Sequence, residues 1–223
     1  MKFSYKPYNI IFELNKTGLH SLVVEESHLY TDMVKDLYRQ MNRIEESWML
    51  SINGTELRLD KGCDLIFSPI DLTFDKKRLQ KRLLENMVEE IEAEGISADI
   101  ASAHAETISA LDRLKQGSAF TIEFDTDLVL EDYLKWHHVR LRDPEGGFLE
   151  QLIEYMGTVR DLTGKSIYIL IGCTDYFCRE DYEHLEKWVQ YQQICVIFLS
   201  GRQIESDIRV NEYIIDSDLC EIH

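Results

Sequence analysis

Apolar residues follow two different spacings along the chain, and the difference is clearest in its last third. Two continuous apolar runs, at 166–171 and 194–199, stand on either side of a segment, 179–193, whose apolar residues recur at helical spacing. Continuous apolar runs are typical of strands covered on both faces, and a helix joins parallel neighbours of this kind. The pattern predicts a parallel strand–helix–strand unit.

The first seventy residues carry further short strands. Apolar patterning predicts strands at 9–14, 19–24, 48–52, 55–59 and 64–67, a helix over 27–44, and a last strand near the other end of the chain at 212–215. The Asn53-Gly54 dipeptide lies between two of these strands and favours a tight hairpin turn. The two ends of the chain therefore predict one α/β domain.

The middle of the chain has a helical pattern. We expect helices over 75–94, 97–116, 128–140 and 148–164, with a short strand at 120–123. The apolar seam is narrow and its surroundings are acidic, which favours an elongated arm packed as a short coiled coil or helical hairpin. The predicted fold is an α/β head domain with a partly parallel sheet, residues 1–70 plus 163–223, interrupted by an elongated helical arm over 71–162.

Charge complicates the assignment of a partner. The 223 residues carry a formal net charge of −17, and an acidic surface repels polyphosphate. Thirteen acidic residues against two basic ones fall within 83–132, so most of the excess lies in the predicted arm. A basic cluster precedes this segment and consists of Lys76, Lys77, Arg78, Lys81 and Arg82. The predicted arm therefore contains both the basic cluster and most of the acidic excess.

Compartment is indicated by the cysteines and by hydropathy. The five cysteines are an odd number at scattered spacings, without a Cys-x-x-Cys motif. No apolar run approaches the length of a membrane span, and the first residues lack the apolar core of a signal peptide. We expect a reducing, cytoplasmic setting without membrane association.

Five carboxylates fall within ten residues, without a basic side chain among them: Glu123, Asp125, Asp127, Glu131 and Asp132. The first three alternate, so an extended segment points them the same way, and Glu131 falls one helical turn after Asp127. Four carboxylates could thus meet at one point, where calcium accepts oxygen ligands in loose geometry. A plain solvated acidic face is the alternative.

The basic cluster, Lys76 to Arg82, forms one like-charged stripe at the start of a predicted helix. Like charges four residues apart repel, and positive charge at a helix N-terminus opposes the dipole. This local cost is consistent with contact to phosphate, and equally with neutralisation of the nearby acidic face in an oligomer.

Gly164-Lys165-Ser166 invites comparison with a phosphate-binding loop. That motif needs a glycine five residues before Gly164, where Val159 stands, and it needs a strand before and a helix after the loop. Here a helix precedes and a strand follows. We therefore expect a helix-to-strand turn with a glycine cap instead.

With these features placed, the layout of the whole chain resembles the CRISPR-associated adaptation protein of type II-A systems. The similarity is carried by the segments 48–52, 166–171, 194–202 and 212–216, and by Glu123, Asp125 and Asp127 leading into a helix. Ser200-Gly201 departs from the pattern, because an acidic residue and a proline are expected there.

The resemblance implies a degenerate P-loop-NTPase-like head without a working phosphate loop, and no chemistry of its own. It implies a homotetrameric ring that binds calcium and threads double-stranded DNA ends, independent of sequence, through a basic central hole. CRISPR integrase proteins and the RNA-guided effector nuclease are the implied partners. By position, Glu123, Asp125, Asp127 and Glu131, with Asp132 beside them, would bind calcium, and Lys76, Lys77, Arg78, Lys81 and Arg82 would be candidates for the hole.

Two other functions use the same residues. Carboxylates around paired metal ions support hydrolysis, so a metal-dependent phosphohydrolase or nuclease is one alternative. A protein-binding scaffold without affinity for nucleic acid is the other, and the net charge is its main support.

Overall fold

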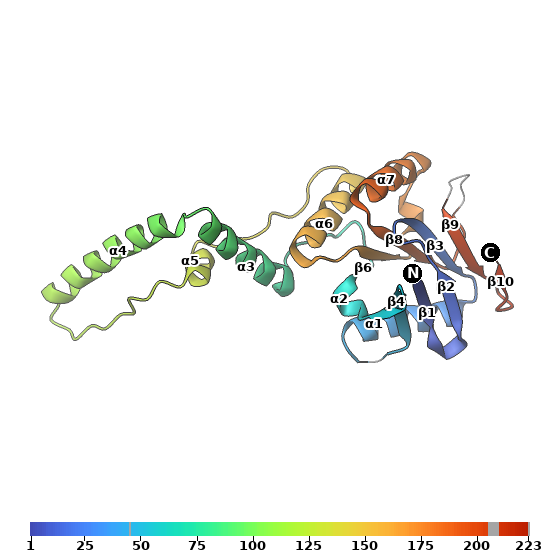
Figure 1. The fold of residues 1–223 in the computed structure, drawn as a ribbon, viewed down its shortest axis with the longest axis horizontal. Coiled ribbons are helices and arrows are strands. Elements are labelled where there is room, and N and C mark those ends of the chain that lie inside the picture. The colour runs from blue at the N-terminus through green and yellow to red at the C-terminus, as the bar shows by residue number, and fades with distance from the viewer. Residues whose placement is uncertain (45, 205–209, 223) are drawn as a thin grey trace. The chain divides into compact units, whose positions relative to one another are not determined.

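The computed structural model describes residues 1–44, 46–204 and 210–222. It divides into two compact units (Figure 1). We call Met1–Thr73 with Pro144–His223 the head unit, and Phe74–Asp143 the helical unit.

A sheet of six described strands forms the centre of the head unit, in the order β10-β9-β3-β8-β7-β6. Their bounds are β3 Gly18–Val24, β6 Cys63–Ile66, β7 Ile167–Ile171, β8 Cys195–Ser200, β9 Asn211–Ile215 and β10 Glu221–Ile222. The five strands from β9 to β6 are parallel, and β10 is antiparallel to β9. Every residue of β3, β7 and β8 is buried, which confirms the parallel unit predicted from the continuous apolar runs.

A second, antiparallel sheet lies in the same unit, in the order β2-β1-β4-β5. Its strands are β1 Lys2–Tyr5, β2 Ile10–Glu13, β4 Trp48–Ile52 and β5 Thr55–Leu57. The β4–β5 turn uses the left-handed backbone of Asn53 (φ 53°) and Gly54 (φ 80°), as the dipeptide predicted. β1 was not predicted. It pairs with both β2 and β4 and so places β2 in the antiparallel sheet, whereas β3 belongs to the parallel sheet.

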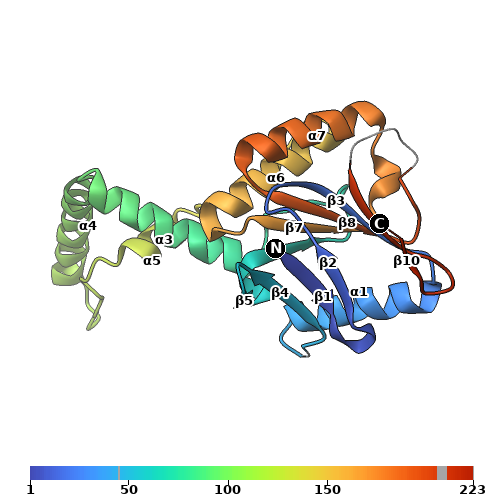
Figure 2. The same ribbon diagram turned by 45° about the vertical axis from the view of Figure 1, so that its right-hand side comes forward.

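Helices cover both faces of the parallel sheet. α6 (Phe148–Thr163) and α7 (Arg179–Gln192) lie on one side, while α1 (Ser27–Met41) lies on the other, near the antiparallel sheet (Figure 2). Apolar residues of α1 share a core with Trp48, whose ring stacks on Phe3 at 4.4 Å between centroids. The short elements are η1 Lys6–Tyr8, α2 Leu59–Gly62 and η2 Thr174–Tyr176.

The second boundary between the units differs from the expected position near residue 162. The head unit resumes at Pro144, so α6 belongs to it. The reason is packing: α6 buries an apolar face and contacts α7. The helical spacing of α6 was read correctly from the sequence, but spacing alone does not say which unit covers the apolar face.

The helical unit contains α3 (Lys77–Ala93), α4 (Ser97–Gly117) and α5 (Leu130–Trp136). Its small core joins Leu84 and Ile91 of α3 to Leu134 of α5. The expected strand at 120–123 is irregular chain, and the helix expected over 128–140 is shorter. No helix in the described part of the chain is both long and apolar enough to cross a bilayer.

Candidate nucleic-acid and metal-binding sites

The basic cluster lies at the N-terminal end of α3. All five of its side chains, those of Lys76, Lys77, Arg78, Lys81 and Arg82, belong to exposed residues. Leu79 and Leu84 on the same helix are buried, so the helix directs its apolar residues inward and its cations to solvent. Glu85 forms ion pairs with two of the cations on the same helix. Its Oε1 lies 3.6 Å from Lys81 Nζ, and its Oε2 lies 2.9 Å from Arg82 Nη1. The cluster thus remains an accessible basic stripe.

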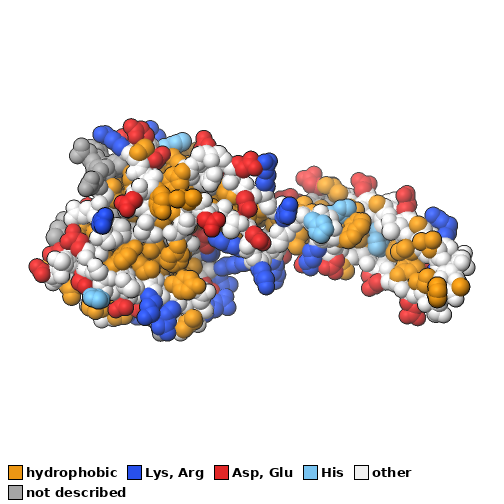
Figure 3. Space-filling view, turned by 180° about the vertical axis from the view of Figure 1, so that it is seen from behind, with side chains coloured by type: hydrophobic (Ala, Val, Ile, Leu, Met, Phe, Trp, Pro, Cys, Tyr) orange, Lys and Arg blue, Asp and Glu red, His pale blue; other side chains and the backbone are white. Residues whose placement is uncertain are grey.

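The acidic segment, residues 123–132, spans irregular chain and the start of α5. Glu123, Asp125 and Asp127 are exposed on the irregular part. Two contacts connect this part to α4: His104 Nε2 lies 3.1 Å from the Thr126 carbonyl oxygen, and Lys115 Nζ lies 5.7 Å from the centroid of the Phe124 ring. Figure 3 shows acidic side chains spread over the visible face of the helical unit.

Convergence of these carboxylates is not found within one chain. Among the described residues, no group of three or more His, Cys, Asp or Glu side chains is placed to hold a metal ion. The expected turn from Asp127 to Glu131 fails because α5 begins only at Leu130. The donor set is chemically suited to calcium, since it offers only carboxylate oxygens, but one chain does not assemble it.

Glu131 and Asp132 already have a cation as partner. Lys135 Nζ lies 2.7 Å from Glu131 and 3.1 Å from Asp132. The hydrogen bonds to Glu131 first, and to Asp132 next, raise the pKa of Lys135. These two carboxylates are therefore less available than the three on the irregular segment.

Lys165 explains why Gly164-Lys165-Ser166 is not a phosphate loop. Its Nζ lies 2.7 Å from Asp64 Oδ1, and its side chain is 5% exposed. The Tyr155 hydroxyl donates to the other oxygen of Asp64 at 2.8 Å, and burial raises the pKa of Tyr155. Gly164 caps α6 in the left-handed conformation, as predicted. The lysine is thus part of the structural core.

The start of α1, where the central strand β3 leads into a helix, is a common place for ligand phosphate in parallel sheets. Here Glu26 accepts hydrogen bonds from the amides of Leu29 at 2.6 Å and His28 at 3.0 Å. These bonds lower the pKa of Glu26, which keeps its negative charge on the helix N-terminus. A carboxylate of the chain itself therefore occupies the position of an anion.

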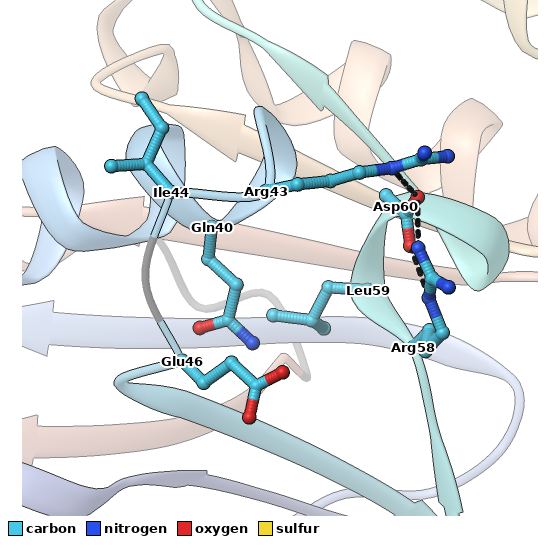
Figure 4. Close-up of a pocket in the computed structure, with 7 residues that line it drawn as sticks. All are labelled: Gln40, Arg43, Ile44, Glu46, Arg58, Leu59 and Asp60. Atoms are coloured by element: carbon cyan, nitrogen blue, oxygen red, sulfur yellow. Dashed lines mark hydrogen bonds and ion pairs between the residues drawn. The ribbon is translucent and has the colours of Figure 1, made fainter.

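The structure also reveals an arrangement of arginines that the sequence reasoning missed. Arg43 and Arg58 both bind the buried carboxylate of Asp60 at the wall of a cavity of about 360 Å³ (Figure 4). Burial of Asp60 acts to raise its pKa, but Arg58 and Arg43 outweigh burial and hold the pKa below the ordinary value. Only proximity in the fold joins the two arginines, because fifteen positions of chain separate them.

The fold and these sites define a mixed α/β protein with an accessible basic stripe and an exposed acidic segment on a separate helical unit. A family model described as CRISPR-associated protein (Cas_Csn2) matches residues 40–219. The chain belongs to this family, the adaptation proteins of type II-A CRISPR systems, and membership implies a role in CRISPR adaptation.

A similarity to a solved structure is weaker. A metal-chelate type ABC transporter in an inward-facing conformation is 12% identical, with 98% of this chain and 78% of that chain covered at a TM-score of 0.40. A likeness at this level carries no argument about fold or activity.

Proposed function

We propose that the protein is a non-catalytic component of CRISPR spacer acquisition that binds ends of double-stranded DNA, independent of sequence, as a calcium-dependent homotetrameric ring. CRISPR integrase proteins and the RNA-guided effector nuclease are its proposed partners in the cytoplasm. Family membership supports the adaptation role. The helical unit supports the proposed assembly, metal binding and DNA binding.

One observation carries the assembly: α4 is 21 residues long and buries no residue among those described. Leu111 and Leu114 on this helix are 37% and 68% exposed, and Phe120 beyond it is 80% exposed. Most of the stability of a helix in a protein comes from packing of an apolar face, and exposed apolar side chains mark contact surfaces. A second copy of the chain is the proposed cover.

Calcium binding is proposed for the assembled ring. One chain brings no three suitable ligands together among its described residues, so carboxylates of more than one copy must meet. Glu123, Asp125 and Asp127 are the leading ligands because they are exposed, while Glu131 and Asp132 would have to exchange Lys135 for the ion. The bound ion would supply positive charge that offsets repulsion between carboxylates.

DNA contact is assigned to the basic stripe of α3, Lys76 to Arg82. Its cations are exposed despite a net charge of −17, so the protein can offer phosphate a local positive surface. Contact through phosphates carries no sequence information, which agrees with binding independent of sequence.

The test measures mass and DNA binding together. Light scattering after gel filtration should give a tetramer with calcium and a smaller species with chelator. A variant with Glu123→Gln, Asp125→Asn and Asp127→Asn should lose this response, while Asp112→Asn on α4 should keep it. A tetramer unchanged by chelator would remove calcium from the proposal, and equal affinity for a covalently closed circle and a linear duplex would remove threading from the end.

A further inference from the structure

The geometry around Asp60 points to a second nucleic-acid contact, located in the head unit. We propose that Asp60 holds Arg43 and Arg58 as a preorganised pair that binds a phosphate of the DNA backbone. This inference rests on the proposed DNA binding and adds a site to it.

Asp60 fixes both guanidinium groups while leaving donors to solvent. Arg43 reaches it through Nε at 2.9 Å, and Arg58 through Nε at 3.1 Å and Nη2 at 2.9 Å. Figure 4 shows the two side chains approaching the carboxylate from different elements. Each arginine has five N–H donors, and within the described residues no further protein partner takes the rest. The guanidinium groups are thus ordered yet open.

Exposure separates the carboxylate from its partners. The Asp60 side chain is 9% exposed, whereas those of Arg43 and Arg58 are 68% and 61% exposed. The carboxylate is buried and the two guanidinium groups are exposed, so an approaching anion meets the arginines first. The cavity lining holds two cations and two carboxylates, Asp60 and Glu46, and Asp60 is buried under its partners. The affinity for phosphate is therefore argued from geometry and not from net charge, because paired guanidinium groups match the oxygens of a phosphate.

The backbone of Arg43 determines which substitution tests the site. It has φ 63°, the left-handed conformation in which glycine is the usual residue after a helix. The Ile44 amide bonds to the Arg39 carbonyl and the Arg43 amide to the Gln40 carbonyl, the two bonds of a Schellman motif. A non-glycine residue at this position is unfavourable for the backbone, as it is at Gln193 after α7. Glycine is therefore a substitution at position 43 that removes the guanidinium group and relieves the backbone at once.

A second carboxylate, besides that of Asp60, lines the same cavity. Glu46 contributes a carboxylate to the wall and acts against anion binding. The proposal therefore predicts two opposite effects on DNA affinity: removal of the Arg43 side chain should weaken binding, and removal of the Glu46 charge should strengthen it. A role of the arginines in tying α1 to α2 alone would not produce both effects.

The experiment titrates a labelled linear duplex with the full chain in calcium buffer, over a series of salt concentrations. Arg43→Gly should weaken binding by about tenfold and lower the slope of log affinity against log salt by about 0.9 for each phosphate that the variant no longer neutralises. Glycine relieves the backbone, which should offset part of the lost ion pair to Asp60, and thermal unfolding of the variant checks that it remains folded. Glu46→Gln should bind more tightly. The matched control is Arg179→Gln, which removes another arginine that is 61% exposed and bound to a carboxylate.

The possible results distinguish failure of the arginine site from failure of the proposed DNA binding by the protein. A wild-type protein that fails to bind duplex overturns both. If wild type binds, Lys77→Gln with Lys81→Gln weakens binding, and Arg43→Gly matches Arg179→Gln, only the arginine site is wrong. If Arg43→Gly leaves DNA binding intact but abolishes binding of an acidic peptide, the site is a protein contact and the phosphate proposal is overturned.

Discussion

The ion pair between Lys165 and Asp64 fixes the junction of α6 with β7, and it makes a strong prediction about stability. Lys165→Met should lower the free energy of unfolding by about 3–5 kcal/mol, because it leaves the carboxylate of Asp64 without its cation. The triple variant Lys165→Met with Asp64→Leu and Tyr155→Phe, which also removes the hydroxyl that donates to Asp64, should recover much of this loss. Urea unfolding at neutral pH measures both; equal loss in the single and triple variants would contradict the ion-pair account.

His20 predicts a dependence of stability on pH. His20 is 1% exposed, and both of its ring nitrogens are buried. Burial lowers the pKa of His20, so the unfolded chain takes up a proton more readily than the folded one. The stability contributed by neutral His20 is therefore complete above about pH 6.5 and is lost as pH falls below it.

The measurement is the urea midpoint of unfolding at several pH values between neutral and mildly acidic. His20→Gln should flatten the fall relative to wild type, whereas His28→Gln should not, because His28 is exposed. Parallel curves for wild type and His20→Gln would show that other groups cause the fall.

At the residue scale, the sequence predicted what a residue does better than which residues it contacts in the fold. The failure of Gly164-Lys165-Ser166 as a phosphate loop followed from the order of helix and strand, yet Asp64 as partner of Lys165 could not be inferred across 101 positions of chain. The same limit hid Arg43, Arg58 and Asp60, which are ordinary charged residues until the fold joins them.

At the scale of elements, α6 contains a matched pair of glycines. Gly164 ends the helix at φ 71°, where a side chain is strained, whereas an added Cβ at Gly157 meets only Trp188 at 3.8 Å. Gly164→Ala should destabilise the protein by about 1 kcal/mol, and Gly157→Ala should stabilise it by up to about the same amount. Thermal unfolding of both variants tests this, and the same sign for both would contradict the assignment.

Elements with continuous or regular apolar spacing were predictable, and so was the β4–β5 hairpin from its Asn53-Gly54 turn. The strands β7 and β8 and the helices α3 and α6 follow their patterns, because their apolar residues pack against the sheet or against another helix. The expected strand at 120–123 did not form. Phe120 is 80% exposed, so this segment does not pack against an apolar core within the described part of one chain.

At the scale of the whole molecule, the two units differ in how far they cover their apolar residues. The head unit buries its apolar strands fully, whereas α4 buries no residue among those described. The sequence could not predict this difference, because periodicity reports an apolar face without reporting what covers it. The antiparallel sheet was hard to predict for a related reason, since β1 pairs not only with the neighbouring β2 but also with β4, which is distant in sequence.

A single charge on α4 should therefore act on assembly and not on folding. Leu114→Asp places a carboxylate on a side chain that is 68% exposed in one chain, so the free energy of unfolding of the monomer should change by less than about 0.5 kcal/mol. In the ring the same carboxylate would be buried without a partner, and the tetramer should dissociate to smaller species at concentrations where wild type is assembled. Light scattering with calcium present measures the mass.

Gln116→Asp, two positions along the helix and on another face, adds the same charge and should leave the mass unchanged. If both variants remain tetrameric, α4 is not the contact, and the cover for its apolar face must be a different protein.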